Sequence, residues 1–204
     1  MKEKYALKGI DKIGYLDIEA TNLKANFGFI LSWAMIVRNP YTNKIELKYD
    51  VVNKKDFEDS TKSRKITMDA RILKSLIKNI RGVNLLIGHY FHGWGKMDIP
   101  FIRTRCVYNG ITDFPKYKEM RYGDTWTMAH KCYSLNSYRL DAVSDMLGVK
   151  TRKTPVTGLD WQLAQRGDKA SLEYVLDHNI KDAKINYKVH KKIEEYVPIP
   201  TAYI

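Results

Sequence analysis

Two acidic residues, Asp17 and Glu19, lie inside the segment Ile13 to Asn22, whose apolar residues predict a buried β-strand. Residues i and i+2 of a strand face the same side, so both carboxylates are expected to stand together on one face of a sheet. Two anions held so close on an apolar element repel each other and resist desolvation unless a cation neutralises them. A metal ion is the simplest neutraliser, and Mg²⁺ and Mn²⁺ prefer carboxylate oxygens. The alternative is that one acid faces solvent and the other caps a turn.

The net charge is the unusual feature of the composition. The chain has 204 residues, 44% hydrophobic and 28% charged, which is ordinary for a globular protein with a hydrophobic core. The formal net charge of +12 comes from Lys and Arg residues spread along the whole length. Such a surface favours a polyanionic partner, with nucleic acid the leading candidate. An anionic membrane surface and simple solubility are the alternatives.

Cysteine usage and the N-terminal segment predict the compartment. Cys106 and Cys132 lack companion residues at metal-ligand spacing, so two free thiols in a reducing environment are expected. Residues 1–12 are charged and lack the apolar stretch of a signal peptide, and no apolar run is long enough to span a membrane. The sequence therefore predicts an intracellular, cytoplasmic protein.

Hydrophobic periodicity predicts an α/β fold in one domain, residues 1–204, with a mixed sheet of about five strands flanked by helices. After the first strand, runs at 29–37 and 45–52 predict a three-stranded antiparallel meander. A helix over 69–80 then leads to a short apolar strand at 83–87, which suits a sheet interior. Further elements are expected at 98–108 (helix), 120–124 (strand), and 125–131, 140–147, 159–166 and 170–196 (helices).

Two further acids occupy positions where a metal site would need them. Asp98 opens a helix just after the short buried strand, where it would equally serve as a partner of the helix dipole. His178 and Asp182 are four residues apart in the last long helix and share one face. Residues at that spacing more often form a surface His–Asp pair than part of a metal site. Neither pattern identifies a site without the others.

Taken together and in order, these motifs resemble the DEDD 3′–5′ exonucleases, a superfamily with a ribonuclease H-like fold. The resemblance covers nearly the whole chain and rests on the following segments: Leu16-Asp17-Ile18-Glu19-Ala20-Thr21, Met97-Asp98-Ile99-Pro100-Phe101-Ile102, Asp124-Thr125, Leu140-Asp141-Ala142-Val143 with Leu147-Gly148, and His178-Asn179-Ile180-Lys181-Asp182-Ala183.

The resemblance implies the chemistry of the site. Asp17, Glu19, Asp98 and Asp182 would hold two divalent metals, Mg²⁺ or Mn²⁺, about 4 Å apart over the scissile phosphate. One ion would activate water and the other would stabilise the leaving 3′ oxygen. The expected substrate is the 3′ end of single-stranded DNA or RNA, with DNA favoured, and the products are nucleoside 5′-monophosphates.

The last motif departs from the family pattern, which is Tyr-x-x-x-Asp or His-x-x-x-x-Asp. His178 stands in the tyrosine register, and the position five residues before Asp182 holds Asp177. An imidazole titrates near working pH, so His178 is predicted to orient or deprotonate the water. The second motif departs as well, because His89 to His92 replace a region where an Asn commonly precedes the Asp.

Substrate-binding residues are predicted at three places. Tyr90, Phe91 and Trp94 are interleaved with glycines and suit base stacking, although Phe91 and Trp94 would also fit as plugs at the edge of the core. A basic loop is predicted to grip phosphates or simply to face solvent, and consists of Lys150, Arg152 and Lys153. Asn22 and Leu23 occupy positions where relatives touch the terminal nucleotide.

The sequence thus predicts a metal-dependent 3′–5′ exonuclease, a phosphodiester hydrolase. Two alternatives stay open. The chain could be a nucleic-acid-binding module with weak or lost turnover, as the register of His178 suggests, or a ribonuclease H-like endonuclease. The sizes of the reaction products would separate the endonuclease from the exonuclease.

Overall fold

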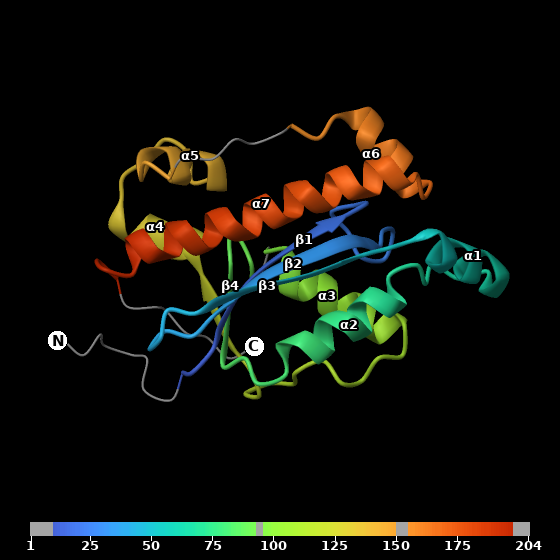
Figure 1. Ribbon diagram of the computed structural model, residues 1–204, viewed down its shortest axis with the longest axis horizontal. Helices are drawn as coiled ribbons and strands as arrows, with labels where there is room; N and C mark the ends of the chain where they lie inside the picture. The colour runs from blue at the N-terminus through green and yellow to red at the C-terminus, as the bar shows by residue number, and fades with distance from the viewer. Residues whose placement is uncertain (1–9, 93–95, 150–154, 198–204) are drawn as a thin grey trace.

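The computed structural model describes residues 10–92, 96–149 and 155–197. Its centre is a five-stranded sheet with the strand order β3-β2-β1-β4-β5. The long helix α7 (Lys169–Ile193) runs across one face, and α2 (Ala70–Ile80) and α3 (Asp98–Tyr108) lie on the other (Figure 1). The predicted α/β fold with a mixed five-stranded sheet is therefore confirmed.

The first three strands form the predicted antiparallel meander. They are β1 (Ile13–Ala20), β2 (Ile30–Arg38) and β3 (Ile45–Val51). The turn between β2 and β3 is held by Asn39, whose side-chain oxygen accepts bonds from the backbone N–H groups of Tyr41 and Thr42 at 2.9 and 3.0 Å. This Asx-type turn explains why the two strands reverse at this point.

Two short parallel strands complete the sheet. β4 (Leu85–Gly88) pairs with β1, and β5 (Arg121–Asp124) pairs with β4. All four residues of β4 are buried, as expected for an interior strand covered on both faces. Because β1, β4 and β5 are parallel, their carboxyl ends meet at one edge of the sheet, where ligands commonly bind in α/β proteins.

Gly88 ends β4 because the chain folds back on itself there. A Cβ atom built at Gly88 would lie 1.9 Å from the ring of Phe91. Only glycine allows the fully buried Phe91 to pack so close to the strand end. This contact fixes the path of the segment that leads toward Asp98.

The helices follow the predicted order with one addition. Besides α2 and α3 they include α4 (Thr125–Cys132), α5 (Leu140–Met146), α6 (Gly158–Gln165) and α7, which ends at Ile193 rather than at Tyr196. The helix α1 (Lys54–Ser63) was not predicted, because few apolar residues recur at helical spacing in it. Its one sequence signal is a capping box, in which Asn53 and Asp56 bond reciprocally to each other's backbone N–H groups.

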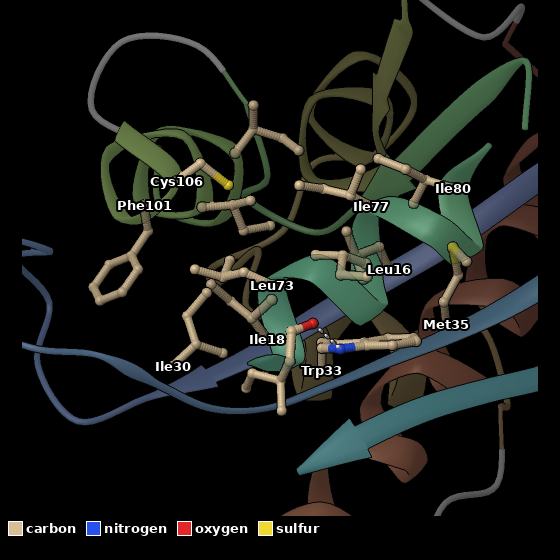
Figure 2. Packing of buried hydrophobic residues seen from close by; sticks show 14 of the residues in the cluster. Leu16, Ile18, Ile30, Trp33, Met35, Leu73, Ile77, Ile80, Phe101 and Cys106 are labelled. Atoms are coloured by element: carbon tan, nitrogen blue, oxygen red, sulfur yellow. Dashed lines mark hydrogen bonds between the residues drawn. The ribbon is translucent and has the colours of Figure 1, made fainter. Parts of the chain in front are cut away.

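The main core lies between the sheet and the pair α2 and α3. Leu16 and Ile18 of β1 pack there against α2, and the indole of Trp33 donates a 2.9 Å hydrogen bond to the carbonyl of Ile72 (Figure 2). Tyr15, two residues before Asp17, instead belongs to a smaller cluster on the face covered by α7. Strand alternation therefore places Asp17 and Glu19 on the α7 face with Tyr15, and Leu16 and Ile18 in the main core.

Both cysteines are free, as predicted, and burial raises the pKa of the Cys106 thiol to about 12. None of the helices in the described ranges is both long and apolar enough to cross a membrane.

Candidate functional site

The helix α7 brings its His and Asp over the acids of β1. The His178 Nε2 atom lies 3.8 Å from a carboxylate oxygen of Glu19 and 3.8 Å from one of Asp182. All three side chains are largely but not fully shielded from solvent. The fold thus joins residues of the first strand and of the last long helix, with the imidazole between the two carboxylates.

Asn179 holds Asp17 from the same helix, and sequence reasoning assigned it no role. Its side-chain amide donates a hydrogen bond to Asp17 at 2.5 Å, and its amide oxygen accepts one from the Ser32 hydroxyl at 3.2 Å. Ser32 sits on β2 directly opposite Glu19. Asn179 is fully buried, so its polar atoms depend on these partners. A polar residue beside His178 was the only sequence signal for this contact.

Asp98 comes from a third segment, the helix α3, which lies on the face of the sheet opposite α7. It is the first residue of α3 and is almost fully buried. Burial raises the pKa of Asp98 well above its ordinary value of 3.8, and the charges of Asp17, Glu19 and Asp124 raise it further. Mutual repulsion of this kind requires that the carboxylates lie near one another. Three chain segments therefore bring acids to one place.

Asp124 is a second residue whose role sequence reasoning missed. It ends β5, caps α4 by accepting bonds from the N–H groups of Trp126 and Thr127, and is 1% exposed. It also accepts bonds from the N–H groups of Tyr90 and Phe91, both at 3.1 Å. The position of an Asp between a strand and a helix indicates a helix cap, but nothing in the sequence shows that it also binds the loop after β4.

Asp124 in this way supports Asp98. The Tyr90 carbonyl accepts a bond from the N–H of Met97 at 3.2 Å, and the Phe91 carbonyl accepts one from Ile99 at 3.0 Å. Asp98 lies between these two donors, so the loop that Asp124 anchors also fixes the first turn of α3. The backbone position of Asp98 relative to Asp124 is thereby fixed by hydrogen bonds.

The predicted substrate residues separate into three groups. Leu23 is 78% exposed, and Asn22 accepts a bond from the N–H of Lys24 that shapes the loop after β1. Tyr90 is 43% exposed, whereas Phe91 is 0% exposed and belongs to the main core. The stacking role predicted for Phe91 is therefore wrong, and the alternative that it plugs the core is correct. The remaining predictions, Trp94, Lys150, Arg152 and Lys153, lie outside the described residues.

The donor chemistry of the acids suits a hard divalent cation. Asp17, Glu19 and Asp98 offer carboxylate oxygens only, and the raised pKa of Asp98 shows that their charges crowd one another. Across the residues that the structure describes, no three His, Cys, Asp or Glu side chains form a ready-made metal cage. An ion such as Mg²⁺ needs no such cage, since it binds through one or two carboxylates, water and substrate phosphates. The donor set therefore fits a cation that binds these carboxylates and completes its coordination with phosphate oxygens of the substrate.

A family model described as RNase_H superfamily matches residues 14–193. The matched span runs from β1 to the last residue of α7, so it contains all the acids described above. No curated protein matches the chain.

Proposed function

The chain belongs to the RNase H superfamily, and from this membership and the acids of the site we propose that it is a metal-dependent 3′–5′ exonuclease. The family and the fold indicate a nuclease that acts on nucleic acid. The direction of cleavage, the preference for single-stranded ends with DNA favoured, and the release of nucleoside 5′-monophosphates are the proposal. It rests on one observation: β1, α3 and α7 bring Asp17, Glu19, Asp98 and Asp182 to the same edge of the sheet.

In the proposed mechanism, Asp17, Glu19, Asp98 and Asp182 would hold two divalent ions, Mg²⁺ or Mn²⁺. Bound ions of this kind supply activation of the attacking water and stabilisation of the leaving 3′ oxygen. The protein's own groups do the positioning. Asn179 fixes one oxygen of Asp17, and the loop bonded to Asp124 fixes the start of α3.

His178 is the proposed proton acceptor. Its Nε2 atom lies 3.8 Å from a carboxylate oxygen of Glu19 and 3.8 Å from one of Asp182, so the imidazole stands between two of the acids that would hold the ions. A water molecule held at the acids would be within reach of this nitrogen, which is the geometric requirement for a general base. Asn22 and Leu23, which follow β1 in the chain, are proposed to touch the terminal nucleotide.

The test is a gel time course on 5′-labelled single-stranded DNA and the matching RNA, with Mg²⁺, Mn²⁺ or chelator. We expect a ladder that shortens from the 3′ end and needs metal. Asp182→Asn should lower kcat by about 100- to 1000-fold, the usual cost of removing one preorganised charge-stabilising group.

Asp177→Asn is the matched control, because Asp177 lies on the same helix but pairs with Lys181 at 2.5 Å. It should leave kcat within about twofold of the parent, since surface ion pairs contribute little. Equal activity of Asp182→Asn and the parent would contradict the proposal. Discrete internal cuts would establish the endonuclease instead, and binding with intact label would establish the binding module.

A further inference from the structure

The strand β3 ends the sheet on one side, and in the described part of the chain no further strand pairs with its outer edge. We propose that this edge pairs with the same edge of a second copy of the chain, antiparallel and centred on Leu47. The surface contains no residue of the candidate site. The inference is therefore independent of the proposed exonuclease, and either can fail without the other.

The backbone of β3 presents unpaired polar groups along its outer edge. Where β2 and β3 meet, the N–H of Asn39 donates to the Lys44 carbonyl and the N–H of Val52 donates to the Leu31 carbonyl, both at 2.9 Å. Hydrogen-bonded pairs alternate along antiparallel strands, so the even-numbered residues of β3 bond β2 and the odd-numbered ones point outward. The outward residues are Ile45, Leu47 and Tyr49. In the described ranges nothing bonds their outward N–H and C=O groups, and such a row can accept another strand.

The free edge is closed at its carboxyl end. The guanidinium of Arg71 donates to the Val51 carbonyl at 2.6 Å, and the N–H of Val51 donates to the side chain of Asp50 at 2.9 Å. Arg71 is held there by bonds of 2.9 Å to both carboxylate oxygens of Asp50. A partner strand can therefore pair with residues 45–49. Because both copies use the same edge, the pairing is complete with two chains and forms no fibre.

The charges on β3 favour one register. When Leu47 lies opposite the partner's Leu47, Glu46 lies opposite the partner's Lys48 and Lys48 lies opposite the partner's Glu46. A shift of two residues would place Glu46 beside the partner's Glu46, or Lys48 beside the partner's Lys48, and like charges directly opposite each other are destabilising. A shift of one residue would set outward backbone groups against inward ones. Charge and backbone pattern therefore agree on the register centred on Leu47.

The other face of β3 supplies apolar contact in the same register. Leu47 packs with Ile36 and Tyr187 in the smaller cluster on the α7 face. Alternation places Ile45 and Tyr49 on that face too, and each is 52% exposed. Pairing about Leu47 sets Ile45 opposite the partner's Tyr49, and aromatic residues and β-branched residues stabilise each other across strands. A second copy thus covers both side chains, and its own symmetry supplies the matching charges.

The oligomeric state of the full chain tests the proposal. Sedimentation equilibrium is measured from about 1 to 300 µM protein in about 150 mM salt, which screens charges farther apart than about 8 Å and so reduces the repulsion between two chains of net charge +12. We expect the parent to pass from monomer to dimer with a micromolar dissociation constant, as is typical of small interfaces. A parent that stays monomeric at every concentration would overturn the proposal, and an extended segment of another protein would then be the remaining partner for this edge.

Charge exchange tests the register. Glu46→Lys and Lys48→Glu each set like charges opposite each other, and each should weaken association by about 10-fold or more. The double variant Glu46→Lys/Lys48→Glu restores opposite charges and should associate as the parent does. Asp113→Lys is the matched control for Glu46→Lys: it makes the same change of charge in an exposed pair with Arg81, at 3.5 Å, in the segment before β5. It should leave association unchanged.

Tyr49→Pro tests the backbone pairing. Proline lacks the N–H that points outward from this position, so the bonds to β2 are kept and the bond to a partner strand is lost. We expect a monomer whose circular dichroism matches that of the parent. A folded Tyr49→Pro variant that dimerises like the parent would overturn the proposal, and so would a double charge variant that stays monomeric. The charge variants leave the backbone unchanged, so they decide the question if Tyr49→Pro does not fold.

Discussion

At the scale of single residues, the site depends on buried polar side chains that orient the acids. Asn179 bonds Asp17 on one side and Ser32 on the other, across 162 and 147 positions of sequence. Removing one partner of a buried hydrogen bond leaves the other unsatisfied, which costs more than the bond itself contributes. The acid of β1 is thus held by a residue that needs no contact with substrate.

We predict that Asn179→Ala lowers the free energy of unfolding by about 1–3 kcal/mol, because it leaves Ser32 and Asp17 without their amide partner. We also expect kcat to fall by roughly 10- to 100-fold, as is usual when a group that orients a metal-binding side chain is removed. Urea denaturation and single-turnover cleavage measure the two effects separately.

Asn136→Ala is the control for this prediction, since Asn136 is exposed and a surface change usually stays within about 0.5 kcal/mol. If Asn179→Ala loses stability but cleaves at the parent's rate under folded conditions, Asn179 supports the fold alone and does not position Asp17.

At the scale of elements, α7 is attached to the sheet along its length. Asn179 bonds Asp17, Asn186 donates to the carbonyl of Ile87 at 3.2 Å, and His190 bonds the Tyr15 hydroxyl at 2.8 Å. These contacts fix the rotation and the register of the helix, and so they fix where His178 lies over Glu19. A shift of one helical turn would move it by about 5.4 Å, out of reach of the acids.

The C-terminal end of α7 carries a charge network that should make stability pH-dependent. Burial opposes ionisation of Glu194, but its bond from Lys191 and the charges of His190 and Arg38 together lower its pKa below 4.5. A depressed carboxyl pKa stabilises the fold above the unfolded value, and that stabilisation is lost as pH falls through the folded value. We therefore predict that the free energy of unfolding decreases as pH falls below about 4.5.

Glu194→Gln tests this network. It should cost about 1–3 kcal/mol at neutral pH, the value of hydrogen bonds to charged groups, and should flatten the acid limb of the stability profile. Glu195→Gln, its exposed neighbour, should keep the parent's profile. Urea denaturation at neutral and acidic pH measures both variants, and parallel profiles for Glu194→Gln and the parent would contradict the assignment.

The elements themselves were largely predictable, and the contacts between them were not. The apolar run of β1 and the helical spacing of α2 are local patterns, so both elements were expected from the sequence. The helix α1 was missed because it has little apolar face to reveal it. Asp124 and Asn179 were left without roles because their partners are distant in sequence. Phe91 was misassigned because its exposure depends on the fold at Gly88.

At the scale of the whole molecule, the sheet edge gathers acids on a protein whose net charge is +12. The carboxylates occupy one small region, and Lys and Arg occur along the whole chain. A polyanion is therefore attracted by the overall field, while the acids repel its phosphates unless cations intervene. Binding and cleavage should consequently respond differently to ions: monovalent salt weakens the first, and divalent ions are required for the second.

We predict a steep salt dependence of binding to single-stranded nucleic acid, because each phosphate neutralised by Lys or Arg releases counterions. With about four such contacts, the logarithm of the binding constant should fall with a slope near −2.8 against the logarithm of salt concentration, which weakens binding about 50-fold between 50 and 200 mM. Fluorescence anisotropy in the presence of chelator measures this slope without cleavage. A methylphosphonate strand of the same sequence, which lacks the phosphate charge, is the control and should give a slope near zero. A flat response for the natural strand would contradict the prediction and would show that the positive charge serves solubility rather than binding of the phosphate backbone.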